Sequence, residues 1–307
     1  MCSQESRLNN SPVIALDAKT FQRPLASLAE TVAYKVEREG PALIKPVFAA
    51  ADINAMVRQA LSIYNVLFFV NADEYRRGGV WRVGYPAALL PLIRCLIDIL
   101  YNITVILIDP GPNAYRYREA GYKRTLDAWQ DLQERYAGKP DWDEYIARNR
   151  KGILDGMRRD AVTIDEVESA ERWPTLGEYL RSSQPLTPHQ EFLKRLTFGF
   201  WKEYSAIAHA TFQGLIPTAI FHMAHAVPHE QREHFDRVAV EDLIAIHLAR
   251  ASGLLVCIVT EIQGYFRFDG ANINQRIHQV WDALLAMPDI KELFDERYAK
   301  LMSDRGI

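Results

Sequence analysis

The spacing of the apolar side chains is the feature that most constrains the fold, because it follows a helical period along most of the chain. In the segment from about 50 to 76, for example, Ile53, Ala60, Tyr64 and Leu67 fall on one helical face. We find no stretch with the strict alternation of apolar and polar residues that is typical of strands, and no internal repeat. The sequence therefore predicts an all-α fold, a multi-helix bundle with long apolar core helices.

The composition suits a globular protein and argues against general binding to polyanions. The chain has 307 residues, of which 49% are hydrophobic and 24% charged. Its 36 Lys and Arg residues against 39 Asp and Glu residues give a net charge of -3, so no overall positive field attracts nucleic acid or an anionic membrane. Cys2, Cys95 and Cys257 lie far apart, which excludes a disulfide framework and predicts a cytoplasmic location.

Two apolar stretches, Pro86–Ile108 and Leu243–Phe266, approach the length of a membrane span. Charged residues interrupt both of them, and in the first these are Arg94 and Asp98. A charge at the centre of a bilayer costs at least about 2.5–3.5 kcal/mol on insertion scales. We therefore expect both stretches to be core helices of a soluble bundle, with no membrane partner.

Helix-breaking residues and changes in polarity define the predicted organisation. Residues 1–20 have no secretory pattern and are expected to form a flexible tail, followed by a single all-α domain over residues 21–307. Within this domain, residues 114–172 are polar, with acids and bases nearly balanced. They predict a helical elaboration that projects from the apolar body and is a candidate surface for a protein partner. Helices are predicted at about residues 50–76, 86–108, 114–136, 141–158, 188–212, 217–226, 230–267, 272–286 and 289–303.

The common motifs for cofactor or metal chemistry are absent. There is no Gly-x-Gly-x-x-Gly, no P-loop and no Gly-x-Ser-x-Gly sequence. The run from His229 to His234 fails both zinc-protease signatures by one position, and Pro228 separates it from His222 and His225. We therefore predict no cofactor and no metal site, and we interpret this run as a solvated helix start.

Two polar ladders on otherwise apolar helices are the best candidates for a functional site. Arg94, Asp98 and Asn102 follow one another at steps of four residues, and Ser205 and His209 are related in the same way. Burying such groups without partners costs several kcal/mol. We infer that the two ladders face each other or a shared cavity.

A purely structural interpretation of the ladders stays open. Arg94 and Asp98 can form an ion pair that fixes helix register, Ser205 can bond a backbone carbonyl, and His209 can be a satisfied core histidine. The stretch from Tyr115 to Arg124, which interleaves aromatic and basic residues, has two readings as well. It can bind single-stranded RNA, or it can be a solvated helix face with a buried tyrosine stripe. The acidic residues that follow this stretch favour the second interpretation.

The two ladders also carry a family resemblance. The first reads Arg94-Cys95-Leu96-Ile97-Asp98 and the second reads Tyr204-Ser205-Ala206-Ile207-Ala208-His209. Over about residues 60–215 the chain resembles uncharacterised, mainly bacterial helical proteins in which Arg-x-x-x-Glu on an apolar helix precedes Tyr-Ser-x-x-x-His. Aspartate here replaces the glutamate. That family in turn resembles the HEPN superfamily of helical bundles, which includes metal-independent ribonucleases and defence components.

The resemblance implies a HEPN-like binding or regulatory component in stress or defence, and it leaves a metal-independent ribonuclease as an alternative. For the ribonuclease, His209 is the candidate general base, with Arg94 or Lys202 on the phosphate and Asp98 orienting Arg94. Tyr204 and Ser205 then position the substrate. The closely spaced Arg–His pair that usually carries HEPN chemistry is missing near His209.

Two further alternatives concern partners. The single histidine can act together with its copy in a homodimer. A different class of function is a pocket for a small polar or anionic ligand between the two ladders, which requires Arg94 and His209 to reach a cavity. RNA, a protein and a small anion thus stay open as partners.

Overall fold

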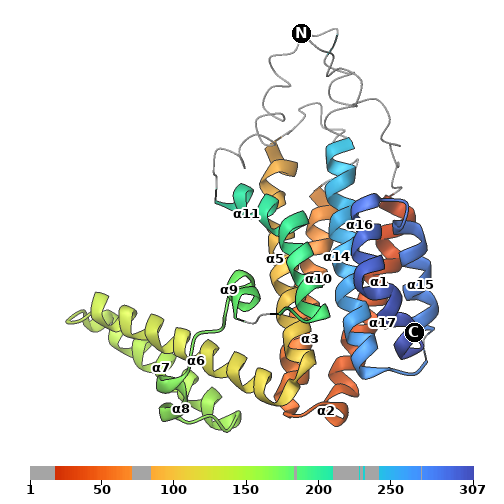
Figure 1. Cartoon of the computed structure of the whole chain (residues 1–307). Helices are drawn as coiled ribbons and strands as arrows, with labels where there is room; N and C mark the ends of the chain where they lie inside the picture. Colours follow the sequence, from red (N-terminus) through yellow and green to blue (C-terminus); the bar gives the residue numbers. More distant parts are fainter. Residues whose placement is uncertain are drawn as a thin grey trace.

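The predicted all-α fold is confirmed. The computed structural model describes residues 18–70, 84–182, 185–209, 242–270 and 272–307, together with Pro228 and Gln231. Every regular element in these ranges is a helix, and none is a strand (Figure 1). Most of the predicted tail, the helix expected at 217–226 and the histidine run from His229 lie outside the described residues.

Helices over residues 18–38, 40–43, 164–169 and 176–181 were not predicted, and the first of them begins within the predicted tail. The described helices otherwise follow the predicted order. They are α1 (Ala18–Arg38), α2 (Gly40–Leu43), α3 (Val47–Val70), α5 (Gly84–Ile108), α6 (Pro110–Arg135), α7 (Pro140–Arg159), α8 (Ile164–Ser169), α9 (Leu176–Arg181), α10 (Pro188–Leu196), the π-helical turn η1 (Thr197–Trp201), α11 (Lys202–Ala208), α14 (Asp242–Phe266), α15 (Ile273–Leu284), α16 (Pro288–Leu293), the π-helical turn η4 (Phe294–Tyr298) and α17 (Ala299–Arg305).

Four long helices, α1, α3, α5 and α14, form the body. α1 and α5 each pack against two of the others, α3 and α14 pack against all three, and α15 and α17 lie against the outer side of α14 (Figure 1). The segments Leu90–Ile108 of α5 and Ala245–Phe266 of α14 are long and apolar enough to cross a membrane, and 56% and 78% of their windows are buried inside the fold. Their apolar side chains form the core with α1 and α3.

The boundary between α5 and α6 lies earlier than the sequence predicts. We expected residues 109–113 to separate the helices, but α6 begins at Pro110 with Asp109 as its N-cap residue. Proline is accepted in a first turn because it has no N–H that needs a partner there. Asn113 donates from Nδ2 to the carbonyl of Val105 at 2.7 Å, so the new helix also satisfies the end of α5.

The helix predicted over 188–212 is divided. A capping box between Thr187 and Gln190 starts α10, and the five-residue turn η1 follows before α11 ends at Ala208. A π-helical turn inserts one extra residue into the helical repeat and shifts every side chain that follows it. In this chain the shift determines how Trp201 and Ser205 face α5.

The polar stretch forms the projecting elaboration that the sequence predicts. Helices α6, α7 and α8 make an arm, defined as residues 110–169, which extends away from the body (Figure 1). The arm has its own small core of Met157, Val162 and Val167, against which Tyr122 and Leu126 pack. These two side chains of α6 therefore pack α6 against α7 and α8 within the arm.

An ion-pair cluster fixes the base of the arm to the body. Arg118 of α6 donates from Nε and Nη2 to the two carboxylate oxygens of Asp52 on α3, both at 2.8 Å. It also pairs with Asp160, which is buried and accepts from the hydroxyl of Tyr122. Arg118 and Asp52 are only 16% and 17% exposed, so water screens these charges weakly.

Candidate functional site: the cleft between arm and body

A cleft lies where the arm leaves the body. Its volume is about 780 Å³, which lies within the range of small-molecule sites. α5 and η1 supply one side, α6 supplies the other, and the connection between α8 and α9 closes one end. The cleft is lined by Arg94, Asp98, Tyr101, Asn102, Tyr117, Arg118, Ala120, Gly121, Tyr122, Lys123, Arg124, Thr125, Asp127, Arg172, Trp173, Pro174, Thr175, Leu176 and Trp201.

Arg94 joins the first polar ladder to the second. Its Nη1 donates to the hydroxyl of Ser205 at 3.0 Å, so the structure brings these two predicted site residues together. Its Nε lies 3.4 Å from Oδ2 of Asp98, and its guanidinium carbon lies 4.5 Å from the centroid of the Trp201 ring. Arg94 is therefore held on three sides, while Nη2 donates to none of the described residues.

Asp98 is the acidic partner in this group. Its Oδ1 accepts from the indole N–H of Trp201 at 3.3 Å. Desolvation raises the pKa of Asp98 above its ordinary value, although Arg94 and Trp201 act in the opposite direction. Asp98 thus contacts both Arg94 and Trp201, although its partial burial disfavours the charged carboxylate.

Two aromatic side chains of the cleft have their polar atoms bonded within the protein. The Trp173 indole donates to Oδ1 of Asn102 at 2.9 Å, and the Tyr101 hydroxyl donates to the carbonyl of Pro174 at 2.8 Å. Tyr117 and Trp173 pack edge to face, with 5.1 Å between ring centroids, and the Tyr117 hydroxyl makes no hydrogen bond to the described residues. Tyr117 and Trp173 are half-buried and present ring surface to the cleft, whereas Tyr101 is only 3% exposed and supports them from the core.

Positive charge exceeds negative charge along the lining. Arg118 is neutralised by Asp52 and Asp160, and Arg172 pairs with Glu178. Lys123 donates to the carbonyls of Glu168 and Ala170 at 3.0 and 2.6 Å and keeps its charge. Arg124 is exposed and bonds no carboxylate among the described residues. The acids of the lining are Asp98, which pairs with Arg94, and Asp127, so the bases stay in excess.

Tyr204 points away from the cleft, although it precedes Ser205 in the chain. It is fully buried, and its hydroxyl lies 2.7 Å from Nδ1 of His247 and 3.5 Å from Nη1 of Arg250. Arg250 donates to the Tyr204 hydroxyl, and the tautomer of His247 decides which of the hydroxyl and Nδ1 donates in the other bond. Nε2 of His247 has no hydrogen-bond partner in the described part of the chain.

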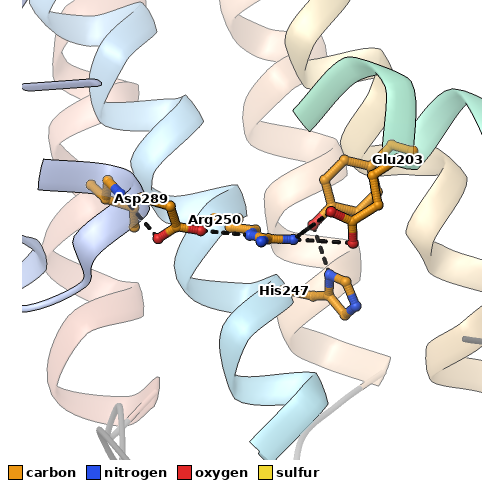
Figure 2. Close-up of polar contacts among 6 residues, drawn as sticks. Glu203, His247, Arg250 and Asp289 are labelled. Atoms are coloured by element: carbon orange, nitrogen blue, oxygen red, sulfur yellow. Dashed lines mark hydrogen bonds and ion pairs between the residues drawn. The ribbon is translucent and has the colours of Figure 1, made fainter. Parts of the chain in front are cut away.

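Arg250 connects three helices beside this pair. It lies between Glu203 of α11 and Asp289 of α16, as Figure 2 shows, with donor–acceptor distances of 3.0 Å to Glu203 Oε2 and 2.8 Å to Asp289 Oδ2. Burial of the neighbouring His247, with a smaller effect from Arg250, lowers the pKa of its imidazole to about 3. The cluster thus combines a neutral histidine with an ion-paired arginine inside the body. Its contacts with Tyr204 indicate a structural role for this side chain.

His209 occupies the C-cap position of α11, one helical turn beyond Ser205. Its backbone N–H donates to the carbonyl of Ser205 at 3.0 Å, and the residue is exposed. Its imidazole is absent from the cleft lining and makes no hydrogen bond to the described residues. The structure therefore unites Arg94, Asp98 and Ser205, and it sets Tyr204 and His209 apart from them.

Sequence reasoning missed the aromatic wall and the bases of the arm as parts of one site. Trp173 and Trp201 carry no motif, and they reach α5 only through the course of the chain after α8 and through η1. The interleaved stretch from Tyr115 to Arg124 was a usable signal, because Tyr117 and Arg124 both line the cleft. Among the described residues, no group of three or more His, Cys, Asp or Glu side chains is arranged to hold a metal ion.

Comparison of the chain with protein-family models, with curated proteins and with solved structures found no match. The similarity to HEPN-like proteins therefore stays a prediction that depends on the short motifs at Arg94 and Ser205.

Proposed function

We propose that this protein binds a small anionic ligand in the cleft between arm and body. The observation that carries the proposal is the surplus of positive charge on a concave surface that is also lined by aromatic side chains. Arg94 offers Nη2, Lys123 offers its charge, and Arg124 is exposed on the facing helix. A binding or regulatory role fits such a site, since the described residues that line it include no histidine for proton transfer.

The ribonuclease hypothesis has less support. It requires His209 to reach a phosphate held by Arg94, and the contact that supports this is the bond of Arg94 to Ser205, one turn before His209. The lining of the cleft does not include His209. Cleavage of RNA in the presence of EDTA, abolished by His209→Ala, is the result that revives this hypothesis.

The test is a thermal-shift panel of citrate, tripolyphosphate and adenosine monophosphate on the full chain. Binding to the folded state alone raises the free energy of unfolding by about 2.7 kcal/mol at a ligand concentration of 100 times Kd. Arg124→Gln is the test variant, because this exposed side chain can be changed without loss of an ion pair. Arg135→Gln is the matched control on α6, outside the cleft.

We expect at least one of the three anions to raise Tm in the wild type and in Arg135→Gln, and to raise it less in Arg124→Gln. No shift with any of the anions, or equal shifts in both variants, contradicts the proposed function.

A further inference from the structure

The cleft joins two kinds of surface that a single ligand can use at once. Tyr117 and Trp173 come from two separate segments and form one aromatic wall, with 5.1 Å between their ring centroids, and the buried Tyr101 contacts Trp173 at 6.4 Å. The charged groups are Arg94, beside Trp201 on the body side, and Arg124 on α6. A ligand that contacts both surfaces needs a flat apolar ring and an anionic group.

The aromatic wall favours a ring over an aliphatic chain. Aromatic rings offer faces and edges, and bases stack on aromatic side chains with little dependence on the identity of the base. Two polar groups beside the rings make no hydrogen bond to the described residues. They are the Tyr117 hydroxyl and Nδ2 of Asn102, whose Oδ1 accepts from Trp173. An amide donor beside a stacking surface can recognise an acceptor on the edge of a heterocyclic base.

The cationic groups favour a phosphate. Arg94 has a fixed orientation, set by Ser205, Asp98 and the Trp201 ring, and its Nη2 stays available. A guanidinium that is already held in place loses less side-chain freedom when it binds an oxyanion. Lys123 and Arg124 add charge from the arm, so a phosphate in the cleft is attracted from both sides.

We propose that the ligand of the cleft is a nucleoside phosphate, with its base against Tyr117 and Trp173 and its phosphate at Arg94 and Arg124. This inference rests on the proposed function, and it adds the chemical class of the ligand. The volume of about 780 Å³ is large enough for a molecule of this size.

Isothermal titration of the full chain tests the inference with five probes that separate ring from charge. They are adenosine monophosphate (AMP), guanosine monophosphate (GMP), adenosine, tripolyphosphate and a single-stranded RNA tetranucleotide. We expect both monophosphates to bind at least tenfold more tightly than adenosine and than tripolyphosphate, because stacking depends little on the identity of the base. This factor corresponds to about 1.4 kcal/mol.

Four variants assign the binding to the cleft. Tyr117→Leu removes a stacking ring and is expected to weaken binding of the monophosphate at least fivefold, whereas Tyr117→Phe keeps the ring and the affinity. Arg124→Gln is expected to weaken it to a similar degree, and Arg135→Gln is expected to leave it unchanged. Circular dichroism at the titration temperature verifies that each variant is folded.

The outcomes separate the two proposals. If tripolyphosphate binds as tightly as the monophosphates, the nucleoside inference is wrong and the anion-binding function stands. If none of the probes binds, both proposals fail. If only the tetranucleotide binds, the cleft recognises a nucleic acid strand, and the inference of a nucleoside phosphate is wrong.

Discussion

Replacement of His189 by leucine is expected to stabilise the protein. His189 lies in the first turn of α10 and is only 8% exposed, and neither of its ring nitrogens has a hydrogen-bond partner among the described residues. Burial, with a smaller effect from Arg297, lowers the pKa of this imidazole to about 3. In the folded protein the imidazole of His189 is therefore neutral, and its two nitrogens make no hydrogen bond to the described residues.

The magnitude follows from two effects. A buried polar group without a partner costs about 1–3 kcal/mol, and a leucine of similar volume removes that cost. In addition, the unfolded chain protonates a histidine below pH of about 6.5 while folded His189 stays neutral down to about pH 3. Because the unfolded state binds more protons between these values, stability falls as the pH is lowered through this window.

Lowering the pH from 7 to 5 thus costs about 2 kcal/mol for His189 alone. His247, with its pKa also at about 3, adds a similar loss, so the wild type loses about 4 kcal/mol from the two rings. We expect His189→Leu to be more stable than the wild type by about 1–3 kcal/mol at pH 7 and by about 3–5 kcal/mol at pH 5.

Urea unfolding followed by circular dichroism at pH 7 and pH 5 measures both differences. His209→Gln is the control, because it also removes one histidine but does so at an exposed position. The reasoning is refuted if His189→Leu destabilises the protein at both pH values, or if its advantage over the wild type is the same at pH 7 and pH 5.

Three further changes test other parts of the structure. Arg118→Leu leaves Asp52 without an ion-pair partner and leaves Asp160 with only the exposed Arg159, so it is expected to cost about 3–5 kcal/mol in urea unfolding, and a loss below about 1 kcal/mol contradicts the anchoring role. Thr187→Ala removes the capping box of α10 and is expected to lower the free energy of unfolding by about 1 kcal/mol, whereas an unchanged Tm argues against it. Asp98→Asn keeps an acceptor for the Trp201 indole and removes a negative charge beside Arg94, so titration is expected to show AMP binding about fivefold more tightly, and weaker binding opposes the assigned phosphate position.

The helices of the body could be predicted because their apolar period is strong and their ends carry proline and capping residues. α7, predicted at 141–158 and observed as Pro140–Arg159, is an example. The start of α6 was misplaced because a proline-rich sequence both ends one helix and fits the first turn of the next. The division of the helix over 188–212 was not predicted, although the π-helical turn contains Gly199 among threonine and aromatic residues, which are weak helix formers.

The candidate site could be predicted only in part. Steps of four residues correctly placed Arg94 and Asp98 on one face, and Arg94 does meet Ser205. The same rule explains Tyr204: consecutive helical residues point about 100° apart, so a chain that turns Ser205 towards Arg94 turns Tyr204 into the core. The aromatic wall depends on the docking of the arm, and sequence spacing carries no information on that arrangement.

Hydrogen–deuterium exchange of the full chain with and without saturating AMP tests the cleft most directly. Peptides from residues 94–102, 117–127 and 171–176 are expected to gain protection on binding, because they line the cleft, while peptides from the outer part of the arm at residues 130–150 are expected to exchange as before. Protection confined to other segments, or no change in these three, contradicts the assignment of the cleft as the binding site.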